Sequence, residues 1–260
     1  MNMERKVVVV TGGAEGIGAA LCRRAAREGA WVMVADIDEA GARALAEEIG
    51  GMALGCDVAR EEDVIRVVGQ AEDHLGPIDF FFSNAGIIVK GDLEVTNDDW
   101  RRIWEINVMS HVYAARAVVP DMLARGGGWF ICTASAAGLL SQIGSAPYSV
   151  TKHAAVGFAE NLAITYGDLG LNVAVVCPQA VRTRMTAQGG GVAAVDGMME
   201  ADQVADCVMA ALEEGRFMVL PHPEVKEYMQ RKTSDYDRWI LGMQRLKARF
   251  QSALGGSPKS

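Results

Sequence analysis

The sequence predicts an α/β fold in which a doubly wound, Rossmann-like parallel sheet forms the middle layer of a three-layer sandwich. Short apolar runs alternate with stretches of helical spacing, and the runs are apolar on both faces, as in strands covered on both sides. A glycine-rich turn also joins the first run to the first helix. We expect one domain over residues 1–260, with strands at 7–10, 31–35, 52–54, 78–82, 129–132 and 173–176.

The first strand leads directly into the turn 11–18, and helical spacing continues through Leu21 and Ala25. A strand that turns tightly into a helix leaves backbone N–H groups free at the positive end of the helix dipole, where a phosphate can bind. An ordinary glycine-rich turn would give the same pattern. The second strand ends at Asp36, and a second helical pattern follows it.

The later elements follow the same alternation. Helical stretches at 98–119 and 153–169 lie between the later strands, and the glycine triplets 126–128 and 189–191 are predicted to be loops. Residues 184–200, which follow the last strand, are expected to form a mobile loop over a substrate. Residues 224–260 are expected to form an amphipathic helix and tail that packs on its own domain, closes a neighbour's pocket or lines a subunit interface.

Composition narrows the class of protein. Half of the 260 residues are hydrophobic and 22% are charged, the net charge is −8, and the sequence pI is about 5.1. This acidity repels phosphate groups, so we expect neither a nucleic acid nor a membrane as partner. The five cysteines are scattered without a Cys-x-x-Cys pair, and no signal peptide or apolar stretch of membrane length is evident. These features favour reduced thiols and a cytoplasmic protein.

A tyrosine and a lysine in the second half of the chain suggest proton chemistry. Tyr148 and Lys152 are four residues apart, so on a helix they share a face. A neighbouring ammonium would favour the ionised phenol, whose ordinary pKa is about 10, and would make it a usable base. The spacing alone also fits a solvated helix face with a packed ring.

The end of the second strand indicates the coenzyme. Asp36 lies 18 positions after Gly18, where a carboxylate can accept hydrogen bonds from the ribose hydroxyls of a dinucleotide. A 2′-phosphate would need a cation there, whereas Ile37 is neutral and Glu15 adds a second negative charge. We therefore expect NAD rather than NADP. An aspartate that only caps a helix or turn is the alternative.

These residues and several further segments make the chain similar to the short-chain dehydrogenase/reductase family over about residues 5–220. The family's Thr-Gly-x-x-x-Gly-x-Gly turn, its Asp-Val pair, its Asn-Ala-Gly segment and its Tyr-x-x-x-Lys pair all occur in order. The resemblance implies catalytic roles for Asn107, Ser135, Tyr148 and Lys152. It implies coenzyme contacts for Thr11, Gly12, Glu15, Gly16, Ile17, Gly18, Asp36, Ile37, Asp57, Val58, Asn84, Ala85, Gly86, Tyr148, Lys152, Pro178, Val181 and Thr183. Family members usually carry glycine after the proline, whereas this chain has Gln179.

The roles follow from the chemistry of alcohol oxidation. Tyr148 would accept the hydroxyl proton as the carbonyl forms, and Ser135 would hold the same oxygen. Lys152 would lower the pKa of Tyr148 and bind the nicotinamide ribose, and Asn107, by resemblance, would support a water chain to solvent. In isolation, Ser135 is equally an ordinary loop serine and Asn107 a local helix cap.

The substrate is expected to be a bulky, apolar secondary alcohol or ketone of the steroid, terpenoid or aryl-alcohol kind. The expectation rests on apolar candidates and on the lack of an obvious basic cluster for an anionic substrate. The expected substrate contacts are Ser135, Tyr148, Ile87, Ala137, Gln179 and Met185, with Ile88, Leu139 and Met198 as further apolar candidates. The alternatives are a 3-oxoacyl-thioester reductase and a non-catalytic NAD(H)-sensing regulator.

Two further expectations concern metals and assembly. The four histidines have no cysteine or carboxylate neighbours at ligand spacing, so no metal site is expected. By resemblance, the helical stretches 98–119 and 153–169 build dimers or tetramers, so a homo-oligomer is expected.

Overall fold

The computed structural model describes residues 2–187 and 189–253, and its centre is one parallel sheet of seven strands. The strand order is β3-β2-β1-β4-β5-β6-β7, which confirms the predicted doubly wound α/β fold. Six strands match the predicted runs, and the two-residue β7 adds an edge that the sequence did not indicate. The strands are β1 (Val7–Thr11), β2 (Trp31–Asp36), β3 (Met52–Gly55), β4 (Ile78–Ser83), β5 (Gly128–Thr133), β6 (Leu171–Val176) and β7 (Met218–Val219).

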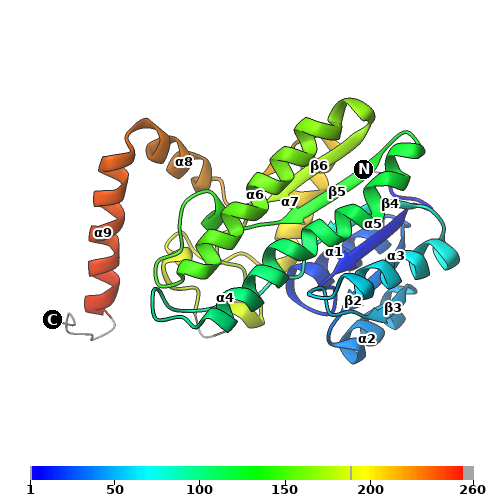
Figure 1. Ribbon diagram of the computed structural model, residues 1–260, viewed down its shortest axis with the longest axis horizontal. Helices are drawn as coiled ribbons and strands as arrows, with labels where there is room; N and C mark the ends of the chain where they lie inside the picture. The colour runs from blue at the N-terminus through cyan, green and yellow to red at the C-terminus, as the bar shows by residue number, and fades with distance from the viewer. Residues whose placement is uncertain (1, 188, 254–260) are drawn as a thin grey trace.

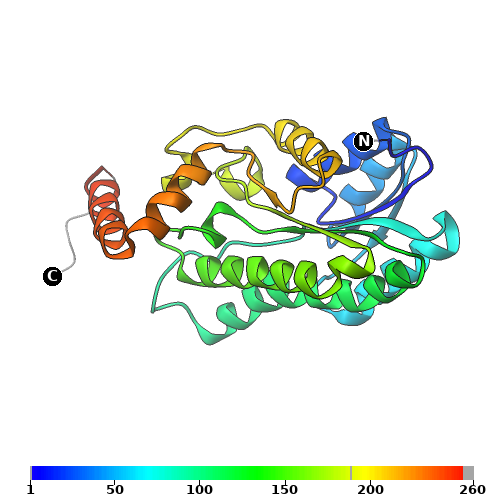
Figure 2. The same cartoon turned by 90° about the horizontal axis from the view of Figure 1, so that it is seen from above.

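Helices cover both faces of the sheet (Figures 1 and 2). One face packs against α1 (Gly16–Arg27), α2 (Glu39–Ile49) and α7 (Ala201–Glu213). The other packs against α3 (Glu61–Leu75), α5 (Ser110–Ala124) and α6 (Ala146–Tyr166). Because both faces are covered, the strands can be apolar along most of their length, as in β1.

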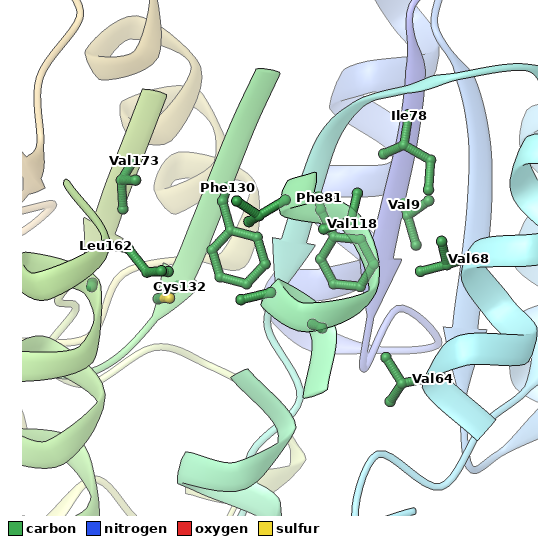
Figure 3. Packing of buried hydrophobic residues seen from close by; sticks show 14 of the residues in the cluster. Val9, Val64, Val68, Ile78, Phe81, Val118, Phe130, Cys132, Leu162 and Val173 are labelled. Atoms are coloured by element: carbon green, nitrogen blue, oxygen red, sulfur yellow. The ribbon is translucent and has the colours of Figure 1, made fainter. Parts of the chain in front are cut away.

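Alternate residues of each strand feed the two cores. Val9 packs with Phe81 and Phe130 beneath α3 and α5, while Val8 and Val10 point to the opposite layer. The rings of Phe81 and Phe130 stack with centroids 5.8 Å apart in this core (Figure 3). Burial of this aromatic pair favours the observed register of β4 against β5.

The order of the strands reverses between β1 and β4, where the two halves of the sheet meet. Helix connections leave the sheet in opposite directions at such a point, so a crevice opens at the carboxyl ends of the strands. Thr11, Asp36, Ser83 and Thr133 end their strands at this edge. The fold therefore brings the predicted functional segments together.

The predicted helix 98–119 is longer and is not uniform. It comprises α4 (Asn97–Trp104), a π-helical turn (Glu105–Met109) and α5 without interruption. The widened turn carries Asn107, and such turns are common at functional sites. The helix predicted at 153–169 begins earlier, at Ala146, because Pro147 suits a first helical turn.

The C-terminal region forms two helices rather than one. α8 (Glu224–Ser234) and α9 (Tyr236–Ala253) meet at Asp235, whose backbone is extended. Both helices project from one end of the molecule, and α9 stands beyond the sandwich (Figure 1). Residues 254–260 of the expected tail lie outside the described residues.

The loop after β6 contains two short 3-10 turns, Arg184–Thr186 and Gly191–Ala194.

Four of the five cysteines are buried, Cys207 is half-buried, and all five thiols are free, as predicted. In the described part of the chain, none of the helices combines the length and apolar character that a membrane span needs.

Candidate active site

A cavity of about 380 Å³ lies along the carboxyl ends of the strands, at the predicted site. The glycine turn forms one end, and Ser135, Tyr148 and Lys152 line the other. Most of the predicted coenzyme contacts line this cavity. They are Gly12, Glu15, Gly16, Ile17, Gly18, Asp36, Ile37, Asp57, Val58, Asn84, Ala85, Gly86, Tyr148, Lys152, Pro178, Val181 and Thr183.

The glycines of the turn are required by its geometry. Gly12 has a φ of +63°, and a Cβ there would lie 2.8 Å from the Cα of Ala85. A Cβ on Gly18 would lie 1.9 Å from the carbonyl oxygen of Gly12. Glu15 precedes α1 but its side chain does not cap the helix, so the first N–H groups of α1 are open to an anion. The turn therefore fits the diphosphate of a dinucleotide.

Thr11 does not line the cavity but is buried behind it. Its hydroxyl accepts hydrogen bonds from the backbone N–H of Asn84 at 3.0 Å and of Ala85 at 3.3 Å. The Asn84 amide donates in turn to the carbonyls of Thr11 and Gly12 at 3.1 and 3.2 Å. Thr11 and Asn84 thus join β1 to β4 and hold the glycine turn in place.

Asp36 is fixed at the mouth of the cavity. Its two carboxylate oxygens accept the N–H groups of Ala14 and Asp38, at 3.0 and 2.9 Å. The cap of α2 is Asp38, which accepts from Gly41, so Asp36 does not serve as the helix cap. Each oxygen of Asp36 keeps a lone pair for a ribose hydroxyl. The next side chain, Ile37, is 75% exposed and offers no charge to a phosphate.

Glu15 differs from the expectation. Its carboxylate forms an ion pair with Arg184, with Nε and Oε2 2.9 Å apart. Arg184 comes from the loop after β6, so the pair links the glycine turn to that loop. Because Glu15 is paired with Arg184, the expectation of NAD rests on Asp36 rather than on Glu15.

Ser135, Tyr148 and Lys152 converge where the cavity meets β5 and α6. The Lys152 ammonium lies 5.8 Å from the centroid of the Tyr148 ring and donates to the carbonyl of Thr133 at 2.9 Å. The Ser135 hydroxyl accepts the N–H of Ala137 at 3.1 Å. These contacts hold the Lys152 amine and the Ser135 hydroxyl at the wall of the cavity that Tyr148 also lines.

The acidities of these groups correct one expectation. Burial raises the pKa of the Tyr148 phenol above its usual 10, and a hydrogen bond from Ser135 opposes this rise. Burial lowers the pKa of the Lys152 amine to about 8. The pKa of Tyr148 is therefore raised and not lowered as expected, because the loss of hydration on burial is the largest influence on it.

Asn107 is fully buried behind the cavity instead of lining it. Its amide accepts from the N–H of Ile87 and donates to the carbonyl of Ile87, both at 2.9 Å, and donates to Thr151 at 3.2 Å. A Cβ on Gly86 would lie 3.2 Å from Lys152 Nζ and 3.3 Å from Asn107 Oδ1. The bare glycine therefore lets these two polar atoms approach the same space.

The buried charge of Lys152 leads to a prediction about stability. Because its pKa is about 8 when folded and 10.5 ordinarily, the folded protein holds a poorly hydrated charge below pH 8. Lys152→Met should raise the free energy of unfolding at neutral pH by about 1–2 kcal/mol, after allowing for the lost bond to Thr133. The gain should shrink as the pH rises from 8 to 10.5. Denaturant titrations at several pH values, with the exposed Lys226→Met as control, measure the difference; a less stable Lys152 variant at neutral pH would contradict the reading.

A second cavity, of about 570 Å³, adjoins the first and shares Ser135 and Gln179 with it. Of the predicted substrate contacts, Ser135, Ala137 and Gln179 line this second cavity, whereas Tyr148, Ile87 and Met185 line the first. Three further candidates are not among the residues that line either cavity: Ile88, Leu139 and Met198.

The sequence did not indicate which residues form the outer wall of the second cavity. This wall is formed by residues of α8 and α9, among them Tyr228, Trp239, Met243 and Leu246. Four arginines also line it, although the sequence shows no basic cluster near the predicted substrate contacts: Arg231, Arg238, Arg245 and Arg249. The amphipathic pattern of α9 was the available signal, but it could not indicate which surface the helix faces.

Gln179 replaces the usual glycine and connects three segments. Its backbone N–H donates to His222 at 3.1 Å, and its side-chain amide donates to Asp196 at 3.2 Å. Asp196 also accepts from the Tyr228 hydroxyl of α8 at 2.9 Å. The longer side chain therefore ties the end of β6 to the following loop and to α8 across the second cavity.

The described residues contain no group of three or more histidine, cysteine, aspartate or glutamate side chains arranged to hold a metal ion.

Comparisons with known proteins agree with this geometry. A family model described as short chain dehydrogenase matches residues 6–190. The chain is 35% identical to a 1-deoxy-11-beta-hydroxypentalenate dehydrogenase of Streptomyces exfoliatus, over 92% of this chain and 91% of the relative. It is 33% identical to 3beta-hydroxysteroid dehydrogenase 2 of Eggerthella lenta, over 69% and 72%. A short chain dehydrogenase/reductase from Burkholderia phymatum, solved in complex with NAD, shares the fold with a TM-score of 0.83 at 24% identity, over 100% and 98% of the two chains.

Proposed function

The chain belongs to the short-chain dehydrogenase family and is an oxidoreductase of that family, and from this premise we propose its reaction. The proposed reaction is the NAD-dependent interconversion of a bulky, largely apolar secondary alcohol and its ketone. One observation carries the proposal: Ser135, Tyr148 and Lys152 line the cavity that contains the glycine turn, next to its junction with a second, mostly apolar cavity. The names of the two relatives support a hydroxyl-bearing polycyclic substrate.

Each residue has a role in the proposed mechanism. Tyr148 takes the hydroxyl proton during oxidation and returns it during reduction, and Ser135 holds the same oxygen as its charge changes. Lys152 steadies the phenolate, binds ribose hydroxyls and passes the proton on, and Asn107 positions the residues around Gly86 for that transfer. A nicotinamide, when bound, supplies the hydride acceptor for oxidation and the hydride donor for reduction.

The preference for NAD is proposed from the mouth of the first cavity. Asp36 is held there as a carboxylate acceptor, and Ile37 beside it is uncharged. A 2′-phosphate would meet a negative charge at about hydrogen-bonding distance, which costs affinity.

A screen of secondary alcohols with NAD tests the function. Steroids, terpenoids, aryl alcohols and hydroxyacyl thioesters are offered, and NADH formation is followed by its absorbance. Oxidation should accelerate from about pH 7 to about pH 10, because Tyr148 must lose its proton and burial raises its pKa. Reduction of the matching ketone should slow only above about pH 10, where the phenol begins to lose the proton that it must donate. NADH binding without turnover of any alcohol or ketone would instead favour the non-catalytic sensor.

Reduction of 3-oxoacyl thioesters is the second candidate. The observation in its favour is the arginine-lined second cavity, because the carriers of such thioesters bear phosphate groups. A strong preference for NADPH with a 3-oxoacyl thioester would establish it in place of the first proposal.

We further propose a cytoplasmic homodimer or homotetramer. Large apolar side chains are exposed on the α4 and α6 surface, with Trp104 39%, Val150 47% and Ile164 82% exposed. Burying this surface against a second copy would remove apolar area from water. Light scattering of the purified protein would give the mass of the assembly.

A further inference from the structure

We infer that the substrate carries an anionic group at the end remote from the reacting hydroxyl, and that arginines of α9 bind this group. The inference rests on the proposed function and specifies the substrate of the same site. The anion is a carboxylate or a phosphate, both of which a planar guanidinium can bind through two parallel hydrogen bonds.

Charge is the first support for this inference. The second cavity is lined by four arginines, and no aspartate or glutamate is among its described lining residues. The protein as a whole carries a net charge of −8, so the positive charge of this cavity lining is opposite in sign to that of the whole protein. Like charges gathered around one cavity repel each other unless an anion enters it.

Two of the arginines are available for such an anion. Arg231 is paired with Glu227 at 2.9 Å and lies 5.7 Å from the Tyr228 ring. Arg238 and Arg245 have no carboxylate partner within the described part of the chain. They are seven residues apart, which places them on one face of α9 about 10 Å from each other along the axis.

Lys232 contacts both the start of α9 and the loop that follows Ser135. This buried lysine, at the end of α8, donates to the carbonyls of Leu139 and Leu140 at 2.7 and 3.1 Å. Its ammonium also lies 4.9 Å from the centroid of the Trp239 ring in α9. Leu139 and Leu140 follow Ser135 closely in the chain, so the start of α9 is tied to the loop of the catalytic serine.

The remaining lining sets the shape of the molecule that fits. Ala137, Leu140 and Val195 lie on the inner side of the cavity, and Trp239 and Met243 lie on α9. An apolar body would occupy this space, with its hydroxyl at Ser135 and its anion at the arginines. A volume of about 570 Å³ is in the range that encloses a polycyclic or medium-chain molecule.

Paired probes test the inference. The carboxylates are lithocholate and 4-(1-hydroxyethyl)benzoate, and their methyl esters are neutral partners with the same body. For at least one pair, the wild-type protein should bind or oxidise the carboxylate about 10- to 100-fold better than its ester. Arg238→Gln combined with Arg245→Gln should remove this preference, because it weakens binding or oxidation of the carboxylate much more than that of the ester. Lys247→Gln, on the same helix but outside the lining, is the control that should preserve the preference.

A second arm distinguishes phosphate from carboxylate. 3-Hydroxydecanoyl-CoA is compared with its N-acetylcysteamine thioester, which lacks the phosphates. An arginine-dependent preference for the CoA form alone would assign the arginines to phosphate. Equal constants for the charged and neutral members of all pairs, in the wild type and in the double variant, would overturn the inference.

Binding and turnover are measured separately, so that the two proposals can fail independently. Calorimetry gives the dissociation constants, and NADH absorbance gives the rates. Arginine-dependent carboxylate binding without oxidation would support the inference and count against the proposed reaction. Oxidation of neutral alcohols with no arginine effect would do the reverse. If instead vesicles containing phosphatidylserine bind α9, and Lys247→Gln weakens that binding as much as the double variant while no probe shows a preference, the basic face serves a membrane and the inference falls.

Discussion

Replacing Tyr148 with phenylalanine should lower turnover by about 1000-fold or more, while the affinity for NADH stays within a few-fold. The ring, its contact with Lys152 and the walls of both cavities remain, and only the oxygen that moves the proton is removed. Ser135 can still hold the substrate oxygen, but a serine hydroxyl cannot serve as the base near neutral pH. Steady-state rates and titration of NADH fluorescence separate the two effects.

Tyr166→Phe is the matched control, because it removes the same atom from the far end of the same helix. Its rate should equal that of the wild type. A Tyr148 variant with near-normal activity would reject the assignment of the base, and one with equal losses of rate and NADH affinity would indicate a structural role instead.

The second large effect concerns the coenzyme. Asp36→Ala combined with Ile37→Arg should shift the ratio of kcat/KM for NAD over NADP by about 100- to 1000-fold toward NADP. The carboxylate that repels a 2′-phosphate is removed, and a guanidinium is placed at a position that is now 75% exposed beside it. The two ratios are measured with one alcohol at one pH.

Glu39→Gln removes a negative charge close by, on α2, from a residue outside the cavity lining. This control should leave the ratio unchanged. If the double variant also kept the wild-type ratio, discrimination would lie elsewhere, and the Glu15–Arg184 pair would be the next place to examine.

The fold was predictable because its determinants are local. Val7 to Val10 are β-branched and apolar on both faces, as in a covered strand. Gly12 and Gly18 lie where any side chain would collide with the backbone. The cavity follows from the topology, because parallel strands that end at Asp36, Ser83 and Thr133 bring their next residues to one edge.

The substrate side was less predictable because it depends on distant packing. The periodicity of α9 predicts an amphipathic helix, but not that the start of this helix contacts Lys232, which is bonded to the 139–140 loop, or that its arginines line a cavity near Ser135. Likewise, spacing puts Lys152 beside Tyr148 but does not reveal that burial controls both of their pKa values. The break between α8 and α9 at Asp235 and the ion pair of Glu15 with Arg184 also depend on tertiary structure, so the sequence pattern did not predict them.

A crystal structure with NADH and a ketone substrate tests the central claim most directly. The diphosphate should lie at the glycine turn, the adenosine ribose should bind Asp36, and the ketone oxygen should lie within about 3 Å of both Tyr148 Oη and Ser135 Oγ. The carbonyl carbon should then face C4 of the nicotinamide. A nicotinamide bound away from Tyr148, or a phenol turned from the substrate oxygen into the protein interior, would contradict the account.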